Sequence, residues 1–316
     1  MMAAVIAYPL TPFRSGVVDQ NAFIGLVKRA AEARVDAITV LGSTGGYAYL
    51  GLSERMRLLR IAIDAAGAVP VYVGIGTPAT RDVVALAVDA EKAGAAGGLL
   101  APVSYQPLTR DEVSGLYEDV TGASGLPLIV YDNPRTTGFS FDDPLLASVA
   151  ALPGVTGIKT AGVSDDPGVA AQRYAALREI VPKHVAVGFS GDAFAAASMI
   201  AGYEVWHSVL AGVLPGVALD LASAVSRGDG AHATVRSAAL ASLWALNARH
   251  AGMRTSAAIA EHLGIAAPDC LPRPLLGLSD DERREWRHSS TRSTGPRARP
   301  SAPRCPRRRR AGEPGR

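Results

Sequence analysis

The sequence predicts an α/β protein, a (β/α)8 TIM barrel with about three additional helices at its C-terminal end. Short apolar runs alternate eight times with longer amphipathic stretches within about 210 residues. The runs are almost continuously hydrophobic, which is typical of parallel strands buried on both faces. No glycine fingerprint of a dinucleotide-binding turn follows the early runs, and its absence disfavours a doubly wound sheet.

The eight expected strands follow one another at the spacing of β/α units. They cover Ala4–Tyr8, Ala37–Leu41, Val69–Gly74, Gly97–Ala101, Leu128–Tyr131, Val155–Lys159, Val185–Phe189 and Val205–Val209. Residues that cap helix starts stand between them, among them Asp19, Asp142, Asp165 and the capping box of Thr109 with Glu112.

The barrel and the helices after it are expected to form one domain. Residues 1–210 are assigned to the barrel and residues 211–280 to a helical extension of it. Breaks at Gly228-Asp229-Gly230 and at Ala251-Gly252 divide the extension into about three helices. Residues 281–316 are expected to be a disordered arginine-rich tail, because few of them are apolar.

The charge of the chain is divided unevenly between the body and the tail. Residues 283–316 carry twelve arginines and two acids, a net charge of +10, which leaves −7 on residues 1–282 within the total of +3. A nucleic-acid tether is one reading of such a tail, and an extension without selected function is the other. We favour the second, because no aromatic residue stands among the arginines after Trp286. Nucleic acid is therefore an unlikely partner.

Composition indicates a cytoplasmic protein with neither a metal nor a cofactor. No run approaches the roughly 18 apolar residues that cross a membrane, and the start of the chain lacks the features of a signal peptide. The two cysteines, Cys270 and Cys305, imply no disulfide framework. The six histidines show none of the spacings that bind metals.

Lys159 is the first candidate for chemistry. It ends the sixth apolar run, and it is one of only four lysines among 32 basic residues. A lysine amine forms Schiff bases once its pKa is depressed, whereas arginine does not. In the alternative interpretation, Lys159 has no catalytic role and its ammonium group lies in water just past the strand end.

The side chains at the other strand ends suit an imine-forming site. Active sites of such barrels lie at the C-terminal ends of the strands, which selects Ser43 and Thr44, Tyr131 and Lys159. Lys159 would attack the ketone of a 2-oxo acid, and the protonated imine would act as an electron sink. The two hydroxyls and a glycine-rich turn would bind the carboxylate, and Tyr131 would move protons. Asp192 is expected only to cap the helix after the seventh strand.

At these positions the sequence resembles the dihydrodipicolinate synthase / N-acetylneuraminate lyase family of pyruvate-dependent class I aldolases. The resemblance covers residues 5 to about 280. Its elements, in family order, are Thr11-Pro12-Phe13, Gly42-Ser43-Thr44-Gly45, Tyr131-Asp132-Asn133-Pro134, Gly157-Ile158-Lys159 and Ser190-Gly191-Asp192.

The resemblance implies a lyase that cleaves or forms carbon–carbon or carbon–oxygen bonds, without a cofactor, in a homotetramer built as a dimer of dimers. It implies Lys159 as the Schiff-base lysine and Tyr131 as the catalytic tyrosine. The full set of expected catalytic residues is Lys159, Tyr131, Thr44 and Tyr105. The expected substrate-binding residues are Ser43, Gly45, Arg135, Thr136 and His207.

Several of these positions depart from the pattern of the synthases. Their second tyrosine, which crosses the dimer interface, aligns with Ser104, and Tyr105 stands one residue later. Their arginine for the second substrate aligns with Thr136, and Arg135 stands one residue earlier. His207 is read either as a residue that tunes specificity or as a packed core histidine.

The departures leave the second substrate open. A dihydrodipicolinate synthase-like reaction is the leading prediction. A 2-keto-3-deoxy sugar acid dehydratase or aldolase and an N-acetylneuraminate lyase-like enzyme are alternatives. An inactive binding protein on an aldolase fold is the alternative of another class.

Overall fold

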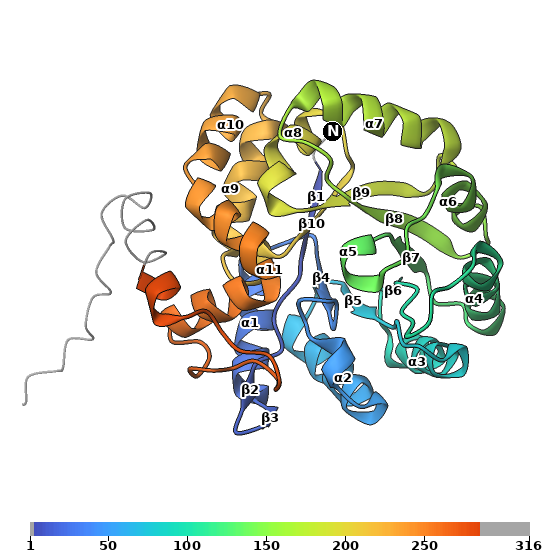
Figure 1. Cartoon of the computed structure of the whole chain (residues 1–316), viewed down its shortest axis with the longest axis horizontal. Helices are drawn as coiled ribbons and strands as arrows, with labels where there is room; N and C mark the ends of the chain where they lie inside the picture. Colours follow the sequence, from blue (N-terminus) through green and yellow to red (C-terminus); the bar gives the residue numbers. More distant parts are fainter. Residues whose placement is uncertain (1–2, 285–316) are drawn as a thin grey trace, which may run out of the picture.

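A closed parallel barrel forms the centre of the computed structural model, which describes residues 3–284 (Figure 1). Within these residues the barrel has eight strands in the order β1-β10-β9-β8-β7-β6-β5-β4. They are β1 (Ala4–Ala7), β4 (Ala37–Val40), β5 (Val71–Gly74), β6 (Gly97–Leu100), β7 (Leu128–Tyr131), β8 (Val155–Ala161), β9 (Ala186–Ser190) and β10 (Val205–Ser208). The predicted (β/α)8 barrel is confirmed.

Helices cover the outside of the barrel between successive strands (Figure 1). They are α1 (Gln20–Glu32), α2 (Leu52–Ala66), α3 (Thr80–Ala93), α4 (Arg110–Ala123), α6 (Asp143–Ala150), α7 (Pro167–Ile180) and α8 (Ala195–Ile200), whereas the one-turn helix α5 (Pro134–Thr137) after β7 is seen within the ring of strands. Asp19, Thr109 and Asp142 accept hydrogen bonds at the first turns of α1, α4 and α6, as their positions predict. The cap of α7 is Asp166 and not Asp165, one residue later than expected.

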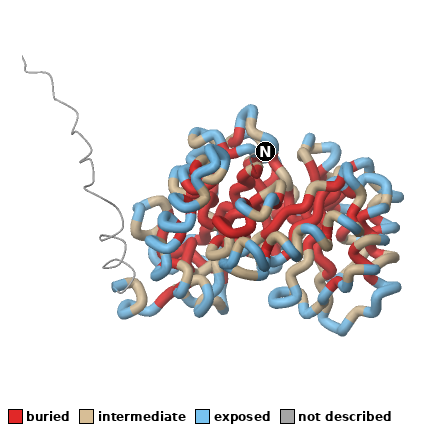
Figure 2. The backbone as a smooth tube through the Cα atoms, turned by 90° about the horizontal axis from the view of Figure 1, so that it is seen from above, coloured by how far each residue is buried: buried red, intermediate tan, exposed pale blue. Residues whose placement is uncertain are grey.

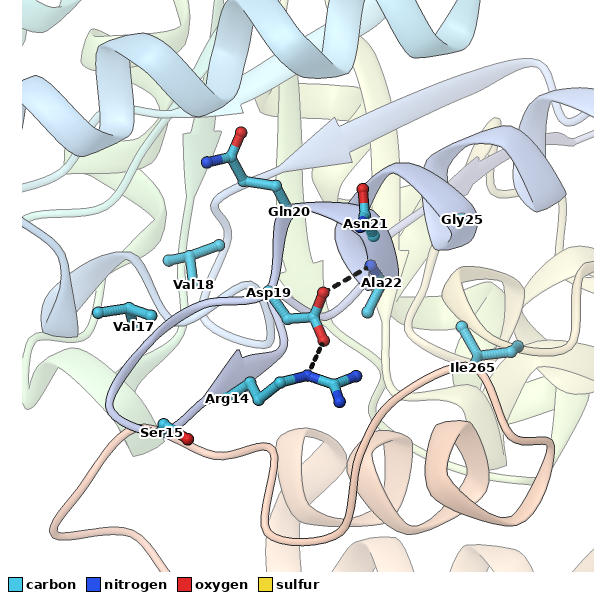
Figure 3. A pocket seen from close by; sticks show the side chains of 10 residues that line it. All are labelled: Arg14, Ser15, Val17, Val18, Asp19, Gln20, Asn21, Ala22, Gly25 and Ile265. Atoms are coloured by element: carbon cyan, nitrogen blue, oxygen red, sulfur yellow. Dashed lines mark hydrogen bonds and ion pairs between the residues drawn. The ribbon is translucent and has the colours of Figure 1, made fainter.

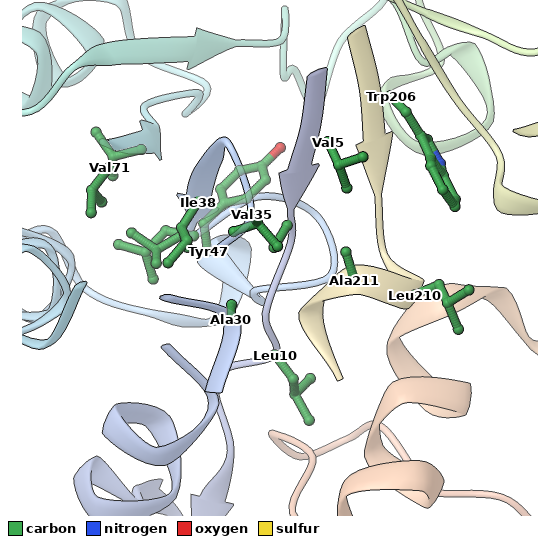
Figure 4. Packing of buried hydrophobic residues seen from close by; sticks show 14 of the residues in the cluster. Val5, Leu10, Ala30, Val35, Ile38, Tyr47, Val71, Trp206, Leu210 and Ala211 are labelled. Carbon is green, nitrogen blue, oxygen red and sulfur yellow. The ribbon is translucent and has the colours of Figure 1, made fainter. Parts of the chain in front are cut away.

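The apolar side chains fall into two clusters, one between the strands and the helices and one inside the barrel. Figure 2 shows the buried strands at the centre and the exposed helical faces outside. In Figure 4, Val5 and Trp206 project from the paired strands β1 and β10 in the larger cluster. The smaller cluster contains alternate strand residues such as Ile129 and Tyr131, which therefore share the inner face of the barrel.

The extension contains α9 (Pro215–Ser226), α10 (Gly230–Ala238) and α11 (Ala241–His262), so the predicted additional helices are confirmed within the described residues. They lie together on one side of the barrel (Figure 1). The chain continues through Ala251, but this residue has non-helical angles (φ 62°, ψ 162°) and divides α11 in two. The predicted break at Ala251-Gly252 is therefore confirmed, and two helical segments meet there at a kink.

Two features differ from the sequence analysis. A small hairpin of β2 (Phe13–Arg14) and β3 (Val17–Val18) follows β1, and its two-residue strands are too short to give a periodic signal. Residues 280–284 begin a helix, because Ser279 and Glu282 form a capping box, so the tail predicted to start at 281 is helical for four residues. The rest of that tail lies outside the described residues.

Candidate active site

The candidate site lies at the C-terminal ends of strands β4, β7, β8 and β10. The residue that follows β1 also contributes to it. Tyr131 of β7 and Lys159 of β8 are paired directly in the barrel register. Both therefore point inward at one level, close to the mouth at which sites of this fold lie. The predicted neighbours Lys159 and Tyr131 are brought together.

The Lys159 amine is buried between two aromatic rings. Its side chain is only 3% exposed. Nζ lies 3.9 Å from the centroid of the Tyr8 ring and 4.0 Å from that of Tyr131. Burial lowers the pKa of Lys159 to about 7, and the charge of Asp192 partly opposes this effect. A large share of the amine is neutral near pH 7, which is what a nucleophilic lysine requires.

The phenol of Tyr131 is held by the strand end that carries it. The Asn133 amide donates a 2.7 Å hydrogen bond to Tyr131 Oη and a 2.8 Å bond to Thr136 Oγ1. Burial raises the pKa of Tyr131, whereas Asn133 and the nearby Ser43 hydroxyl lower it. Thr136 thus reaches the site only through Asn133, as a support for Tyr131.

The turn after β4 presents the predicted hydroxyls. Leu41 begins it with a positive φ of 54°, a costly conformation for a branched residue. A Cβ on Gly45 would lie 2.7 Å from the backbone nitrogen of Leu41, so only glycine closes this turn. Within the described residues, the buried Ser43 Oγ lies near the Tyr131 hydroxyl but has no hydrogen-bond partner. Such an oxygen fits a substrate atom as its missing partner.

A buried arginine supports the neighbouring strand end. Arg55 of α2 donates to the carbonyl oxygens of Gly74 at 2.9 Å and Gly76 at 3.1 Å. Its guanidinium lies 5.1 Å from the centroid of the Tyr47 ring, and burial lowers the pKa of Arg55 to about 10. A Cβ on Gly74 would lie 1.8 Å from the Leu41 carbonyl, so this strand end is packed tightly against the turn.

The kinked helix α11 closes over the same turn. A Cβ on Gly252 would lie 3.6 Å from Thr44 Oγ1, and a Cβ on Gly46 would lie 3.4 Å from Met253 Cε. Arg135 donates a 3.1 Å hydrogen bond to the carbonyl of Ala248, one turn before the kink. Thr44 is therefore at the mouth as predicted, while Arg135 binds the protein's own backbone.

Tyr105 is not brought to the site within the single chain. Its side chain is 93% exposed, and it follows β6 in a turn in which Ser104 is hydrogen-bonded to the backbone of Gln106. A role for Tyr105 near Lys159 would require a second subunit.

Asp192 does not cap a helix, so that expectation is wrong. The helix after β9 is α8, and its N-cap residue is Phe194, with no side-chain hydrogen bond to the cap. Its carboxylate accepts hydrogen bonds from Trp206 Nε1, Ser208 Oγ and the Leu210 backbone N–H, at 3.0, 3.0 and 2.9 Å. Burial raises the pKa of Asp192 to about 6, and the charge of Lys159 is among the effects that lower it. A Gly-Asp pair before a helix looks the same in the sequence whether the aspartate caps that helix or accepts hydrogen bonds from a distant segment.

Tyr8 is the site residue that the sequence analysis missed. It follows β1, where it reads as the end of an apolar run. Its hydroxyl lies 2.8 Å from Nδ1 of His207, and both side chains are buried. His207 is thus a packed histidine, but it is packed beside Lys159, whose charge contributes to lowering the pKa of the imidazole.

Other parts of the described chain offer no competing centre. Residues 3–284 contain no group of three metal-ligating side chains, and none of their helices could span a membrane. An open hollow of about 1050 Å³ lies beside the hairpin β2–β3, with the Arg14–Asp19 ion pair at its wall (Figure 3). None of the predicted site residues lines it.

Comparisons with known proteins agree with this geometry. A sequence profile of the dihydrodipicolinate synthetase family matches residues 1–291. The chain is 34% identical over 222 residues to a 4-hydroxy-tetrahydrodipicolinate synthase from Nitrobacter hamburgensis, a match that covers 70% of this chain and 73% of that enzyme. It is 32% identical over 235 residues to the enzyme of the same name from Phenylobacterium zucineum, covering 74% and 78%.

A solved structure is similar over nearly the whole chain. A dihydrodipicolinate synthase from Agrobacterium tumefaciens superposes with a TM-score of 0.88 at 38% identity, covering 93% of this chain and 98% of that one. The predicted family and its aldolase-type lyase class are thereby confirmed. The chain belongs to the dihydrodipicolinate synthetase family.

Proposed function

We propose that Lys159 forms a Schiff base with pyruvate or a related 2-oxo acid. The observation that carries the proposal is the buried amine between the Tyr8 and Tyr131 rings, with its pKa lowered to about 7. No other lysine combines burial with this position: Lys28, Lys92 and Lys183 are all exposed.

The reaction begins when Nζ attacks the carbonyl carbon C2. The electron pair of the C=O bond moves to oxygen, which takes the Tyr131 hydroxyl proton, and the nitrogen returns a proton to the Tyr131 oxygen. The carbinolamine hydroxyl then takes this proton from Tyr131 and leaves as water, while the nitrogen lone pair forms the C2=N bond. Ser43, Thr44 and the backbone at Gly45 bind the substrate carboxylate, a role supported by the unsatisfied hydroxyl of Ser43.

The imine next loses a proton from C3 and becomes an enamine. In the synthetic direction this carbon then attacks an aldehyde. In the direction of cleavage, the bond between C3 and the aldehyde carbon breaks and the aldehyde is released. The names of the relatives favour the synthetic direction with a dihydrodipicolinate synthase-like product.

The position of the synthases' second-substrate arginine supports a second candidate. That arginine aligns with Thr136, whose Oγ1 accepts a hydrogen bond from Asn133, and Arg135 stands one residue earlier with one N–H donated to the Ala248 carbonyl. Because the aligned side chain carries no positive charge for the carboxylate of an acidic aldehyde, the second candidate is a 2-keto-3-deoxy sugar acid dehydratase or aldolase, or an N-acetylneuraminate lyase-like enzyme.

Borohydride trapping tests imine formation. Incubation with pyruvate and sodium borohydride should add the mass of reduced pyruvate to the peptide containing Lys159. Lys159→Ala should abolish the adduct, and Lys183→Ala, which removes an exposed lysine, should retain it. An unmodified Lys159 peptide in the wild-type protein would refute the proposal.

A substrate panel distinguishes the candidates that remain. Pyruvate with a set of aldehydes tests synthesis, and a set of 2-keto-3-deoxy acids tests cleavage and dehydration. Trapping at Lys159 without turnover of any of them would favour the inactive binding protein.

We further propose a cytoplasmic homo-oligomer, with a dimer of dimers as the expected form. The 93% exposed Tyr105 supports it, because a partner subunit would give this ring a place to pack. Light scattering on wild-type protein and on Tyr105→Ala, each with an activity assay, tests both the assembly and the contribution of this tyrosine.

A further inference from the structure

Tyr8 and His207 form a buried polar pair on neighbouring strands at the mouth of the barrel. β1 pairs with β10, with Ile6 opposite His207, so Tyr8 stands two residues beyond on the same inward face. The phenol oxygen lies 2.8 Å from Nδ1, and the rings meet edge to face at 75°. Each side chain is 2% exposed.

Glycines make room for this pair. A Cβ on Gly42 would lie 3.1 Å from Cδ1 of Tyr8, and one on Gly188 would lie 2.4 Å from Nε2 of His207. A Cβ on Gly212 would lie 2.2 Å from the carbonyl oxygen of Tyr8. A Cβ at Gly188 or Gly212 would force a shift of the pair or its backbone, and one at Gly42 would press the Tyr8 ring aside by a few tenths of an ångström, so the two rings are closely packed at all three positions.

The pair borders the amine that is to react. Nζ of Lys159 lies over the face of the Tyr8 ring, 3.9 Å from its centroid, so an imine formed on Nζ would be held against this ring. Burial and the charge of Lys159 both lower the pKa of His207 well below its usual value. The imidazole is therefore neutral before the reaction, and one of the two effects that keep it so, the positive charge at the Lys159 nitrogen, disappears when the iminium becomes an enamine.

We propose that Tyr8 and His207 together remove the proton from C3 of the imine and return it later in the reaction. This inference rests on the proposed Schiff base at Lys159. Tyr131, fixed by Asn133 and close to Ser43, serves the carbon–oxygen steps, and Tyr8 serves the carbon–hydrogen step.

The step moves one proton along two hydrogen bonds. The Tyr8 oxygen takes the proton from C3 while the Tyr8 hydroxyl proton passes to Nδ1 of His207, whose other nitrogen already carries a hydrogen. The electron pair of the C–H bond forms C2=C3, and the C2=N pair returns to nitrogen. The iminium becomes a neutral enamine as His207 becomes a cation, so the buried site holds one positive charge throughout.

Exchange of the pyruvate methyl protons in D2O isolates this step. The measurement follows loss of the methyl signal by proton NMR and needs no second substrate. Tyr8→Phe keeps the ring under Lys159 and removes the hydroxyl. His207→Asn retains an oxygen that accepts the Tyr8 hydrogen bond but cannot take its proton. Tyr72→Phe, which removes a hydroxyl from another tyrosine packed against the barrel interior, is the matched control.

Both site variants should retain borohydride trapping at Lys159 and lose exchange by about 10²–10⁴-fold, the scale of a positioned proton-transfer group. Tyr72→Phe should exchange at the wild-type rate. Wild-type exchange in His207→Asn would overturn the proposal, because a merely structural hydrogen bond survives in that variant. Should Tyr8→Phe fail to fold, His207→Asn decides alone. If the wild-type protein showed no borohydride trapping at Lys159, this would instead refute the proposed Schiff base itself.

Discussion

The Asp192 carboxylate raises the pKa of the Lys159 amine, and it does so against the larger effect of burial. The acid is itself buried and held by three donors from the β10 segment, so its distance from the lysine is set by the barrel. The pKa of about 7 at Lys159 is thus a balance between a dry environment and one fixed negative charge.

Asp192→Asn should shift the pH dependence of imine formation. Removing the negative charge lowers the pKa of Lys159 below about 7, so the acid limb of the trapping rate moves to lower pH. Trapping rates measured from pH 5 to 9 would check this. Asp132→Asn, at another half-buried carboxylate near a strand end, should leave the limb in place. A shift to higher pH in Asp192→Asn would contradict the balance.

Lys159→Met should stabilise the protein at neutral pH, by a few kcal/mol. The folded-state pKa of about 7 lies below the ordinary 10.5. Burial of the lysine amine therefore lowers the free energy of unfolding most below pH 7, where the amine is protonated in both the folded and the unfolded chain. This loss of stability disappears as the pH rises towards 10.5. Urea unfolding at pH 7 and at pH 10 should show a larger gain at pH 7. An equal gain at both values would mean that the amine is not destabilised by burial.

Tyr131→Phe should slow turnover by about 10²–10⁴-fold, because the variant retains the ring over Lys159 but cannot move protons. Thr136→Val removes only the outer hydrogen bond to Asn133 and should cost less than about tenfold. Steady-state rates with the best substrate of the panel would compare them. Equal losses in both variants would argue that Asn133, and not the phenol, is what matters.

Gly45→Ala should destabilise the fold by about 2 kcal/mol or more, since the new Cβ would lie 2.7 Å from the Leu41 backbone. Gly25→Ala is the matched control in the exposed middle of α1, where a Cβ meets nothing within 4 Å. It should stabilise the helix by about 0.5–1 kcal/mol. Thermal unfolding of both variants tests the pair, and a tolerated Gly45→Ala would show that the turn can relax.

The barrel was predictable because each strand is buried on both faces and its apolar run is visible locally. Lys159 and Tyr131 could be found from their places at strand ends. The partnership of Tyr8 with His207 could not, because it joins residues 199 positions apart: His207 could be selected at a strand end, but Tyr8 reads only as the end of an apolar run. The same holds for Arg135, whose acceptor at Ala248 lies 113 positions along the chain. Long-range packing decides what such side chains contact.

The kink of α11 at Ala251 has a consequence for how this enzyme can be divided. Ala248, before the break, accepts a hydrogen bond from Arg135, and Gly252, after it, lies so near Thr44 that a Cβ there would be 3.6 Å from Oγ1, so a segment beyond the last strand covers the mouth. The catalytic unit accordingly ends later than the barrel does. Exchanging residues 241–262 between family members would exchange part of the segment that covers the substrate site. A barrel truncated at residue 210 would lack that segment, and its mouth would be open.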